Sequence, residues 1–270
     1  LKDATEAIEL KPEYAQGYYI RSLIYVNLHE PDKALQDLDT AISLKPGEPS
    51  FLFVKSVCYR EKKMPEEGLK AINKILEIDP KSIDALRERG SIHLEMHNYE
   101  FAVTDFKKVL EYKTDDFGTL CNIASCLSEL KRYDEAQEYY LKAIASDSTE
   151  AYVIYNNIGY FINLEEKNYQ KAIESFDKAI KQNPKFAFSY CNRGYAKMML
   201  GDLKAAMKDV SKSIELNPKN SYAYKNRALI LIADKRVSSA CLDLQKALDL
   251  GYTKQYDEEV NELVKNHCAK

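Results

Sequence analysis

The sequence predicts an all-α protein built as an array of similar helix pairs. Three observations predict this: proline recurs at a fixed spacing, small residues recur in the same register, and turn-forming residues are scarce. Only nine Gly and eight Pro occur among 270 residues, which argues against a turn-rich β protein and against disorder. A fixed period of about 20–50 residues indicates a repeat array, in place of the two domains that the length alone would suggest.

Proline sets the repeat length. The anchors recur at a constant interval, except that one unit is two positions longer than the others. They are Pro12, Pro46, Pro80, Thr114, Ser148, Pro184, Pro218 and Tyr252. We expect the longer unit, which ends at Pro184, to carry one extra residue before its first helix and another in the turn from Leu164 to Tyr169. Loops absorb such insertions at little entropic cost.

Four further columns keep the same register. Small residues lie twelve positions before each anchor, at Ala34, Gly68, Ala102, Ala136, Ala172, Ala206 and Ala240. Large residues follow four positions later, at Leu38, Ile72, Phe106, Tyr140, Phe176, Val210 and Leu244. A second small column is formed by Ser22, Ser56, Gly90, Ala124, Gly194 and Ala228, with Gly159 displaced by an insertion. Tyr or Leu stands four residues before it, at Tyr18, Leu52, Leu86, Leu120, Tyr155, Tyr190 and Tyr224.

This order of an aromatic residue, a glycine, Ala-x3-Phe and a proline resembles the tetratricopeptide repeat, with Tyr or Leu in the place of the absent Trp. The resemblance implies two antiparallel helices per unit, helix A and helix B, stacked as an α-solenoid into a right-handed superhelix. The stretch Asn192-Arg193-Gly194 and the turn Leu200-Gly201-Asp202 resemble bacterial members of the family.

The elements follow in order. Residues 1–12 match only the end of a helix B, with Ala7 and Ile8 on its apolar side. Because the chain does not begin with Met, we expect upstream sequence to have been removed. The seven full repeats are predicted at 13–46, 47–80, 81–114, 115–148, 149–184, 185–218 and 219–252 (together 13–252).

In the sixth repeat, helix A is expected from about Phe186 to Leu200, and helix B ends at Leu216. Pro218 stops it, because a proline disfavours helical dihedrals in the residue before it. Residues 253–270 are predicted to form a capping helix, since Tyr256, Val260, Leu263 and Val264 fall at helical spacing.

Composition excludes several classes of function. The 39 basic and 42 acidic residues give a net charge of −3, so we expect no nucleic-acid partner, which would need a clustered basic excess. The longest apolar stretches fall far short of the roughly 18–20 residues of a membrane span, so none is expected.

No arrangement of side chains predicts catalysis. We expect the six cysteines to be free thiols, which favours a cytoplasmic location. His93 and His97 lie four residues apart, yet no third ligand is evident, so we expect no metal and no cofactor. Without a phosphate-binding glycine loop or a nucleophile beside a base, the chain is expected not to be an enzyme.

A column of asparagines suggests a binding surface. Asn122, Asn157, Asn192 and Asn226 lie two residues before the second small column in four consecutive repeats, where the first three repeats have Ile20, Val54 and Glu88. The resemblance implies that this position faces the concave groove and grips the backbone of an extended peptide, since an amide offers donors and an acceptor. The alternative is a structural column whose side chains bond to a neighbouring repeat.

The resemblance places other side chains in the same groove. Tyr160, Phe188 and Tyr195 are expected to supply apolar contacts, and Lys225 a single charge preference. Leu229 and Ile232 either join them or pack on the capping helix. The carboxylate clamp known in the family needs Lys and Asn in one repeat, Asn in the next, and Lys with Arg in a third. No three successive repeats supply that set.

One correlation points to an ion pair inside the repeats. Asp follows Arg at one fixed interval in four units, and the other units lack both. The pairs are Arg21 with Asp37, Arg89 with Asp105, Arg193 with Asp209, and Arg227 with Asp243. In the second repeat Lys55 occupies the Arg position and Ala71 the Asp position. In the fourth and fifth repeats Ile123 and Ile158 replace the Arg. We expect each Arg on helix A to bind the Asp on helix B.

The predicted function is a non-catalytic scaffold that binds an extended peptide or protein segment in the concave groove. The alternative is a regulatory or self-associating module of a larger protein. The sequence does not identify the partner.

Overall fold

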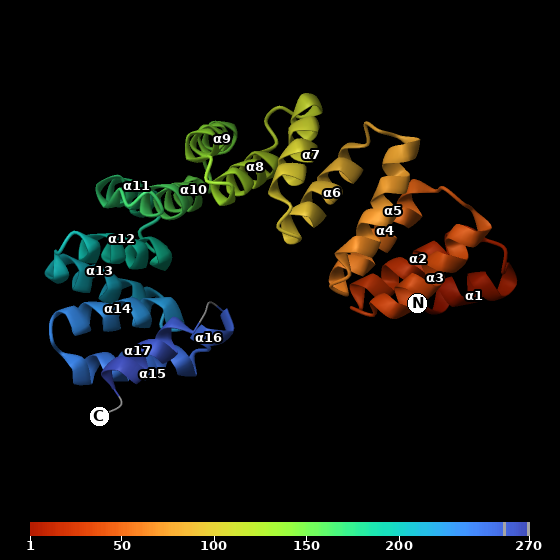
Figure 1. Ribbon diagram of the computed structural model, residues 1–270. Coiled ribbons are helices and arrows are strands. Elements are labelled where there is room, and N and C mark those ends of the chain that lie inside the picture. Colours follow the sequence, from red (N-terminus) through yellow and green to blue (C-terminus); the bar gives the residue numbers. More distant parts are fainter. Residues whose placement is uncertain (256–257, 269–270) are drawn as a thin grey trace. The chain divides into compact units, whose positions relative to one another are not determined.

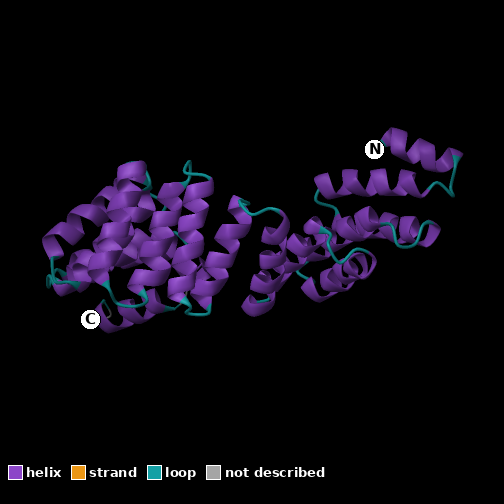
Figure 2. Ribbon diagram, turned by 90° about the horizontal axis from the view of Figure 1, so that it is seen from above, coloured by secondary structure: helices purple, strands orange, loops and turns teal. Residues whose placement is uncertain are grey.

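The computed structural model describes residues 1–255 and 258–268, and this described part is helical throughout, with short connecting loops and no strand (Figures 1 and 2). The chain divides into two compact units, Leu1–Arg132 and Tyr133–Lys270, which are described separately. The division falls inside the repeat predicted at 115–148. None of the described helices is both long and apolar enough to cross a bilayer.

Unit 1 begins with a single helix and continues in helix pairs. Its helices are α1 Lys2–Leu10, α2 Ala15–Asn27, α3 Pro31–Leu44, α4 Pro49–Glu61, α5 Pro65–Ile78, α6 Ile83–Glu95, α7 Tyr99–Tyr112 and α8 Phe117–Glu129. Ile8 of α1 is buried, and a Cβ added at Gly17 of α2 would lie 3.1 Å from it. The first helix therefore packs against the pair that follows it.

Unit 2 continues the alternation and ends in two short helices. Its elements are α9 Tyr133–Ser146, α10 Ala151–Asn157, η1 Ile158–Leu164, α11 Tyr169–Gln182, α12 Ala187–Met199, α13 Leu203–Leu216, α14 Ser221–Ala233, α15 Val237–Asp249, α16 Tyr252–Gln255 and α17 Glu259–His267. The bounds of α12 and α13 agree with those expected for the sixth repeat.

Within each unit, the core of a helix pair is the contact between the small and large columns. The large side chains of helix B, from Leu38 to Leu244, are fully buried in all seven repeats. A Cβ at Gly90 would lie 2.7 Å from the ring of Phe106, and one at Gly194 would lie 2.5 Å from Val210. Real contacts are essentially never this short, so these helices approach too closely for any side chain at those two positions.

The turn between helix A and helix B uses one left-handed residue in every repeat. Its φ lies between +55° and +61° in six repeats, at His29, Lys63, His97, Lys131, Lys167 and Lys235, while Gly201 in the sixth has φ +86°. Two backbone bonds close each turn, as where Glu30 N–H donates to Tyr25 C=O and His29 N–H to Val26 C=O. This is the Schellman arrangement, which satisfies the last carbonyls of a helix.

Of the two extra residues predicted for the fifth repeat, the one expected before helix A lies elsewhere, whereas the turn from Leu164 to Tyr169 is longer, as predicted. Helix α10 begins at Ala151, and its distance along the chain from the start of α9 is the same as in the other repeats, so no extra residue precedes it. Helix α11 begins at Tyr169, two positions later than the spacing of the other pairs would place it. The chain between them includes the π-helical segment η1, whose wider turn accommodates an additional residue. Helix A and its turn therefore take up the extra length.

The C-terminal helix α17 packs on the last pair. Val260 is fully buried, and Leu263 and Val264 contact the cluster that contains Tyr224 and Leu244. Tyr256, which we also predicted for this contact, lies outside the described residues.

A disulfide fastens the same helix, against the prediction of six free thiols. Cys241 of α15 is bonded to Cys268 directly after α17, with the two Cα atoms 5.7 Å apart. Because the residues are 27 positions apart, no short motif signals the pair. Cys58, Cys121, Cys126 and Cys191 are not part of a disulfide, as expected. The bond removes the free-thiol argument for a cytoplasmic location.

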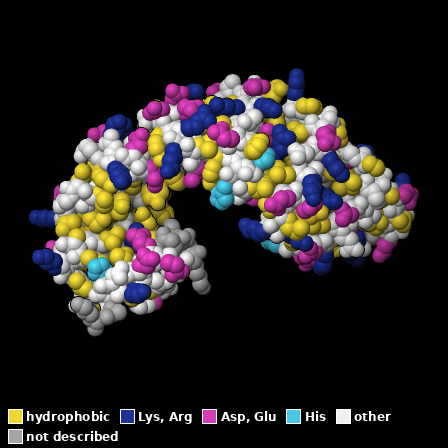
Figure 3. All heavy atoms as spheres, in the orientation of Figure 1, with side chains coloured by type: hydrophobic (Ala, Val, Ile, Leu, Met, Phe, Trp, Pro, Cys, Tyr) yellow, Lys and Arg dark blue, Asp and Glu magenta, His cyan; other side chains and the backbone are white. Residues whose placement is uncertain are grey.

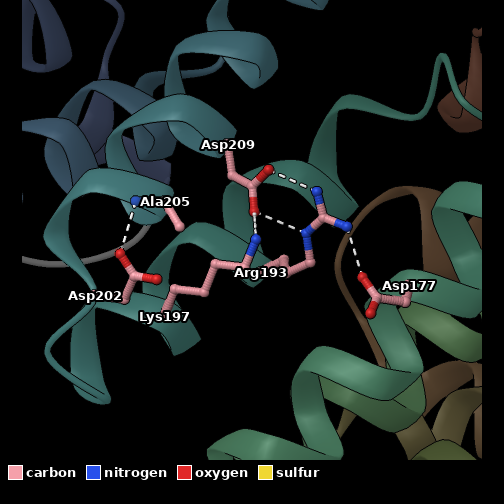
Figure 4. A network of polar contacts seen from close by, with 6 residues as sticks. All are labelled: Asp177, Arg193, Lys197, Asp202, Ala205 and Asp209. Carbon is pink, nitrogen blue, oxygen red and sulfur yellow. Dashed lines mark hydrogen bonds and ion pairs between the residues drawn. The ribbon is translucent and has the colours of Figure 1, made fainter.

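The predicted Arg–Asp pairs are confirmed in all four repeats. Each Arg donates from Nε and Nη2 to the two carboxylate oxygens of its Asp, at 2.6–2.7 Å. The carboxylates are buried, and the hydrogen bond to Asp105 raises the pKa of the Arg89 guanidinium. In the sixth repeat Lys197 also donates to Asp209, and Arg193 reaches Asp177 of α11 (Figure 4). We call each of these bidentate Arg–Asp pairs a fork. The forks join helix A to helix B within a repeat, and Arg193 extends the connection to the preceding repeat.

Replacing Asp209 by Ala should lower the free energy of unfolding by about 3 kcal/mol, because Arg193 and Lys197 then lose their shared buried acceptor. The matched control is Asp177→Ala, which removes the half-exposed partner of the same Arg and should cost less than about 1 kcal/mol. Urea unfolding followed by circular dichroism measures both. Equal losses in the two variants would contradict a dominant role for the buried carboxylate.

Reducing the Cys241–Cys268 bond should lower the free energy of unfolding by about 2–4 kcal/mol, since the cross-link restricts the unfolded chain. Cys241→Ser should reproduce this loss, and dithiothreitol should then have no further effect on the variant. Thermal unfolding with and without the reductant measures it. An unchanged melting temperature of the reduced wild-type protein would contradict the assignment.

Candidate functional site

Unit 2 contains a hollow on the surface formed by its A helices, which we name the groove hollow. It has a volume of about 400 Å³ and is lined by Asn156, Asn157, Tyr160, Phe161, Phe188, Asn192 and Tyr222. These residues come from α10, η1, α12 and α14. Figure 3 shows apolar side chains gathered over α12 and α14. The lining consists of amides and aromatic rings, which are uncharged at neutral pH.

An amide network forms the polar part of the groove hollow. Asn192 Nδ2 and Ser189 Oγ both donate to Asn156 Oδ1 at 3.1 Å, which ties α12 to α10. All three side chains are buried. Asn157, the next residue, is half-buried and lines the hollow directly. Of the four predicted asparagines, Asn157 and Asn192 therefore lie in this hollow, and Asn192 also joins two repeats.

Asn226 does not lie in the groove hollow, so its predicted contact with a peptide needs correction. Its side chain is fully buried, and its Nδ2 donates to Cys191 Sγ at 3.3 Å. Burial raises the pKa of that thiol to about 12, so the sulfur stays protonated. Cys191 directly precedes Asn192 in the chain. In the same way, Asn156, to which Asn192 donates, directly precedes Asn157. The structural alternative thus holds for these two members of the column.

Aromatic rings form the wall of the hollow. Phe188 is 43% exposed and packs against Phe186, which contacts Tyr152 of α10 edge-on. Tyr160 meets Phe161 edge-on, with ring centroids 5.1 Å apart. Burial raises the pKa of Tyr222, and a hydrogen bond with Tyr160 adds to that shift. Tyr222 therefore contributes a neutral phenol to the hollow.

Phe161 was not predicted, because the regular repeat pattern has no position for it. It belongs to the π-helical segment η1, next to the predicted Tyr160. The greater length of the fifth unit was the signal that could have identified this segment.

Lys225 is not free to meet a ligand, contrary to prediction. Its side chain is buried, and its ammonium group pairs with Glu259 of α17 at 3.0 Å. The rings of Tyr195, Tyr222 and Tyr252 lie 4.5–6.0 Å from the same nitrogen. The charge that we assigned to a ligand is therefore used to hold the C-terminal helix.

The remaining predicted residues divide between the units. Tyr195 is half-buried beside Lys225, and burial raises the pKa of its phenol. Ile232 packs in the cluster beneath α17, which favours that alternative for it. Asn122 is half-buried on α8 of unit 1.

Unit 1 has an acid in the asparagine column. Glu88 is buried, accepts from Arg60 at 2.8 Å, and keeps a second buried oxygen, Oε1, without a hydrogen-bond partner. Burial raises the pKa of this carboxyl, and the Arg60 charge opposes the shift. An acid here supports the earlier exclusion of the carboxylate clamp, which needs positive charge.

The histidine pair makes aromatic contacts. His93 stacks on Phe101, and His97 bonds the hydroxyl of Tyr99 at 2.7 Å. Among the described residues, no group of three or more His, Cys, Asp or Glu is placed to hold a metal ion.

Family models match most of the array. A model described as "TPR repeat" matches residues 162–201. A model described as "Tetratricopeptide repeat" matches residues 19–83, and another with the same description matches both 117–150 and 189–220. Together these ranges cover more than half of the chain and fall in both units.

The chain is also similar to individual proteins. Protein FlbA of Caulobacter vibrioides is 35% identical over 98 residues, which are 36% of this chain and 16% of that protein. A tetratricopeptide repeat protein from Parabacteroides merdae has the same fold, with a TM-score of 0.75 and 22% identity over 93% of this chain and 97% of that one. Yeast Tom70 gives a TM-score of 0.66 and 15% identity over 98% of this chain and 57% of its own.

These repeats and this all-helical solenoid fold are those of a scaffold for protein interactions, a class that is typically non-catalytic. By its repeat columns, its helix pairs and these matches, the chain belongs to the tetratricopeptide repeat family and resembles its bacterial members.

Proposed function

We propose that this protein is a non-catalytic scaffold that binds an extended segment of a protein partner in the groove hollow of unit 2. The observation that carries the proposal is the lining of that hollow. It combines an aromatic wall, including the 43% exposed Phe188, with the amides of Asn156, Asn157 and Asn192. Such a lining suits a segment that offers peptide groups and a large apolar side chain.

The amides and the rings have different roles in this proposal. An amide can bond the main chain of any segment, and each such bond contributes roughly 0.5–1.5 kcal/mol. Because Asn226 is buried, fewer amides are accessible than the sequence suggested. The aromatic wall must therefore provide most of the affinity and most of the choice among sequences. Micromolar binding, about −8 kcal/mol, is the expectation for one such segment.

The test is selection of a displayed random peptide library on the intact chain, followed by fluorescence anisotropy with the selected peptides. We expect selected peptides to share a large apolar residue. Phe188→Ala should weaken their binding about tenfold or more, because a buried aromatic contact is lost. Asn157→Ala should weaken it less, by the value of one hydrogen bond.

The matched control is Phe101→Ala, which removes an equally large ring that is 64% exposed on α7 of unit 1. It should leave binding unchanged. Asn122→Ala in unit 1 tests whether that residue contributes at all. If Phe188→Ala and Phe101→Ala behave alike, the groove hollow is not the binding surface. Failure to select any peptide, together with self-association in light scattering, would favour the regulatory or self-associating module.

A further inference from the structure

A three-residue contact recurs at the edge where helix A meets helix B. In the first, sixth and seventh repeats a Tyr lies three residues before the paired Arg, with the guanidinium carbon 5.5–5.8 Å from the ring centre. The Arg then forks to its Asp on helix B. These sets are Tyr18–Arg21–Asp37, Tyr190–Arg193–Asp209 and Tyr224–Arg227–Asp243. Ring, cation and carboxylate together fill the edge of each of these repeats.

The second repeat has a smaller residue at all three positions. Leu52 replaces the Tyr, Lys55 the Arg and Ala71 the Asp. The fourth and fifth repeats also lack the ion pair, but there Ile123 and Ile158 replace the Arg, so no cation is left. Only the second repeat keeps a positive charge while losing the carboxylate at the paired position.

A hollow of about 480 Å³ lies where these side chains are missing, and we name it the repeat-two hollow. Its lining includes the three replaced positions, and α4 and α5 supply all of it. The lining residues are Leu52, Lys55, Tyr59, Glu67, Lys70, Ala71, Asn73, Lys74 and Glu77. The volume lies within the range of small-molecule sites, about 300–1,000 Å³.

Lysines outnumber carboxylates among the residues that line this hollow. Three lysines line it against two glutamates, and one lysine is already paired, since Lys70 donates to Glu67 at 2.6 Å. Lys55 pairs with Asp39 on α3 of the preceding repeat at 2.5 Å, as Arg193 pairs with Asp177 in the sixth repeat. The Asp39 side chain is 61% exposed, so exchanging it for another carboxylate costs little. Lys55 also lies 5.8 Å from the ring of Tyr59, which gives the hollow an aromatic side.

We propose that the repeat-two hollow binds a small aromatic carboxylate, which supplies the ring and the carboxylate that this repeat lacks. The carboxylate takes the position of the missing Asp and accepts from the Lys55 ammonium. The ring packs over Leu52 and Ala71, where other repeats have a tyrosine side chain. The site lies wholly in unit 1 and is independent of the groove hollow in unit 2.

The experiment is isothermal titration of the whole chain with phenylacetate and with phenylacetamide, its neutral counterpart. We expect phenylacetate to bind at least about tenfold more tightly than the amide, because only the acid offers a charge to Lys55. Lys55→Met should remove this preference. Ala71→Asp restores the carboxylate of the repeat and should abolish binding of phenylacetate.

The matched control is Lys108→Met, which removes an exposed lysine on α7 of the same unit and should change nothing. Circular dichroism reports whether each variant folds, and if Ala71→Asp does not fold, Lys55→Met and the acid–amide comparison decide. A Gly-Gly-Phe peptide with a free carboxylate distinguishes the source of the ligand. Binding of phenylacetate alone assigns the site to a free small molecule, and binding of both extends it to a chain terminus. Equal binding of acid and amide, or equal effects of Lys55→Met and Lys108→Met, would overturn the proposal.

Discussion

The close approach of helix A to helix B within each pair is the constraint on which this structure depends. Where a Cβ at Gly90 or Gly194 would enter the side chain opposite, no residue other than glycine fits without displacement of the helices. Close packing then brings the two backbones near enough for a guanidinium on helix A to reach both oxygens of a carboxylate on helix B. The fork is directional, so it fixes the rotation of one helix against the other more sharply than apolar contact alone.

The periodic contacts could be predicted from the sequence, because each is repeated and one register explains them all. The small columns, the buried large column and the Arg–Asp forks belong to this class. The contacts that occur once could not be predicted. Cys241 and Cys268 share no motif, and Lys225 meets Glu259 across a segment outside the repeat pattern. Asn226 occupies a periodic position, yet its neighbour Cys191 decides what it bonds. The left-handed turn residues recur in register but vary in type among His, Lys and Gly, so identity alone conceals them.

The asparagine column shows why a family pattern predicts a surface better than it predicts contacts. Asn192 and Asn226 both donate to a side chain of the preceding repeat. The acceptors are Asn156 and Cys191, which directly precede the column members Asn157 and Asn192. The same column position thus serves two roles: its amide can bond to the preceding repeat, or it can face the groove and meet a ligand. How deeply the side chain is buried decides between these roles. At Asn226 burial is complete, whereas Asn157 remains half-buried beside aromatic rings. Recognition therefore depends on how the repeats differ from one another, since what they share is already used for stacking.

The π-helical segment in the fifth repeat carries a consequence for how such arrays diversify. In an ordinary α-helix one inserted residue turns every later side chain by about 100° and would remove Gly159 from Phe176. A Cβ at Gly159 would still meet that ring at 2.5 Å, as the equivalent glycines meet their partners, so the packing phase is kept. Further along η1, Ile162 and Asn163 are buried and Phe161 lines the groove hollow, so the lengthened helix keeps a buried side and adds to that lining. Lengthening a helix in this way lets one repeat change what its surface displays, while its neighbours continue to stack against an unchanged interior.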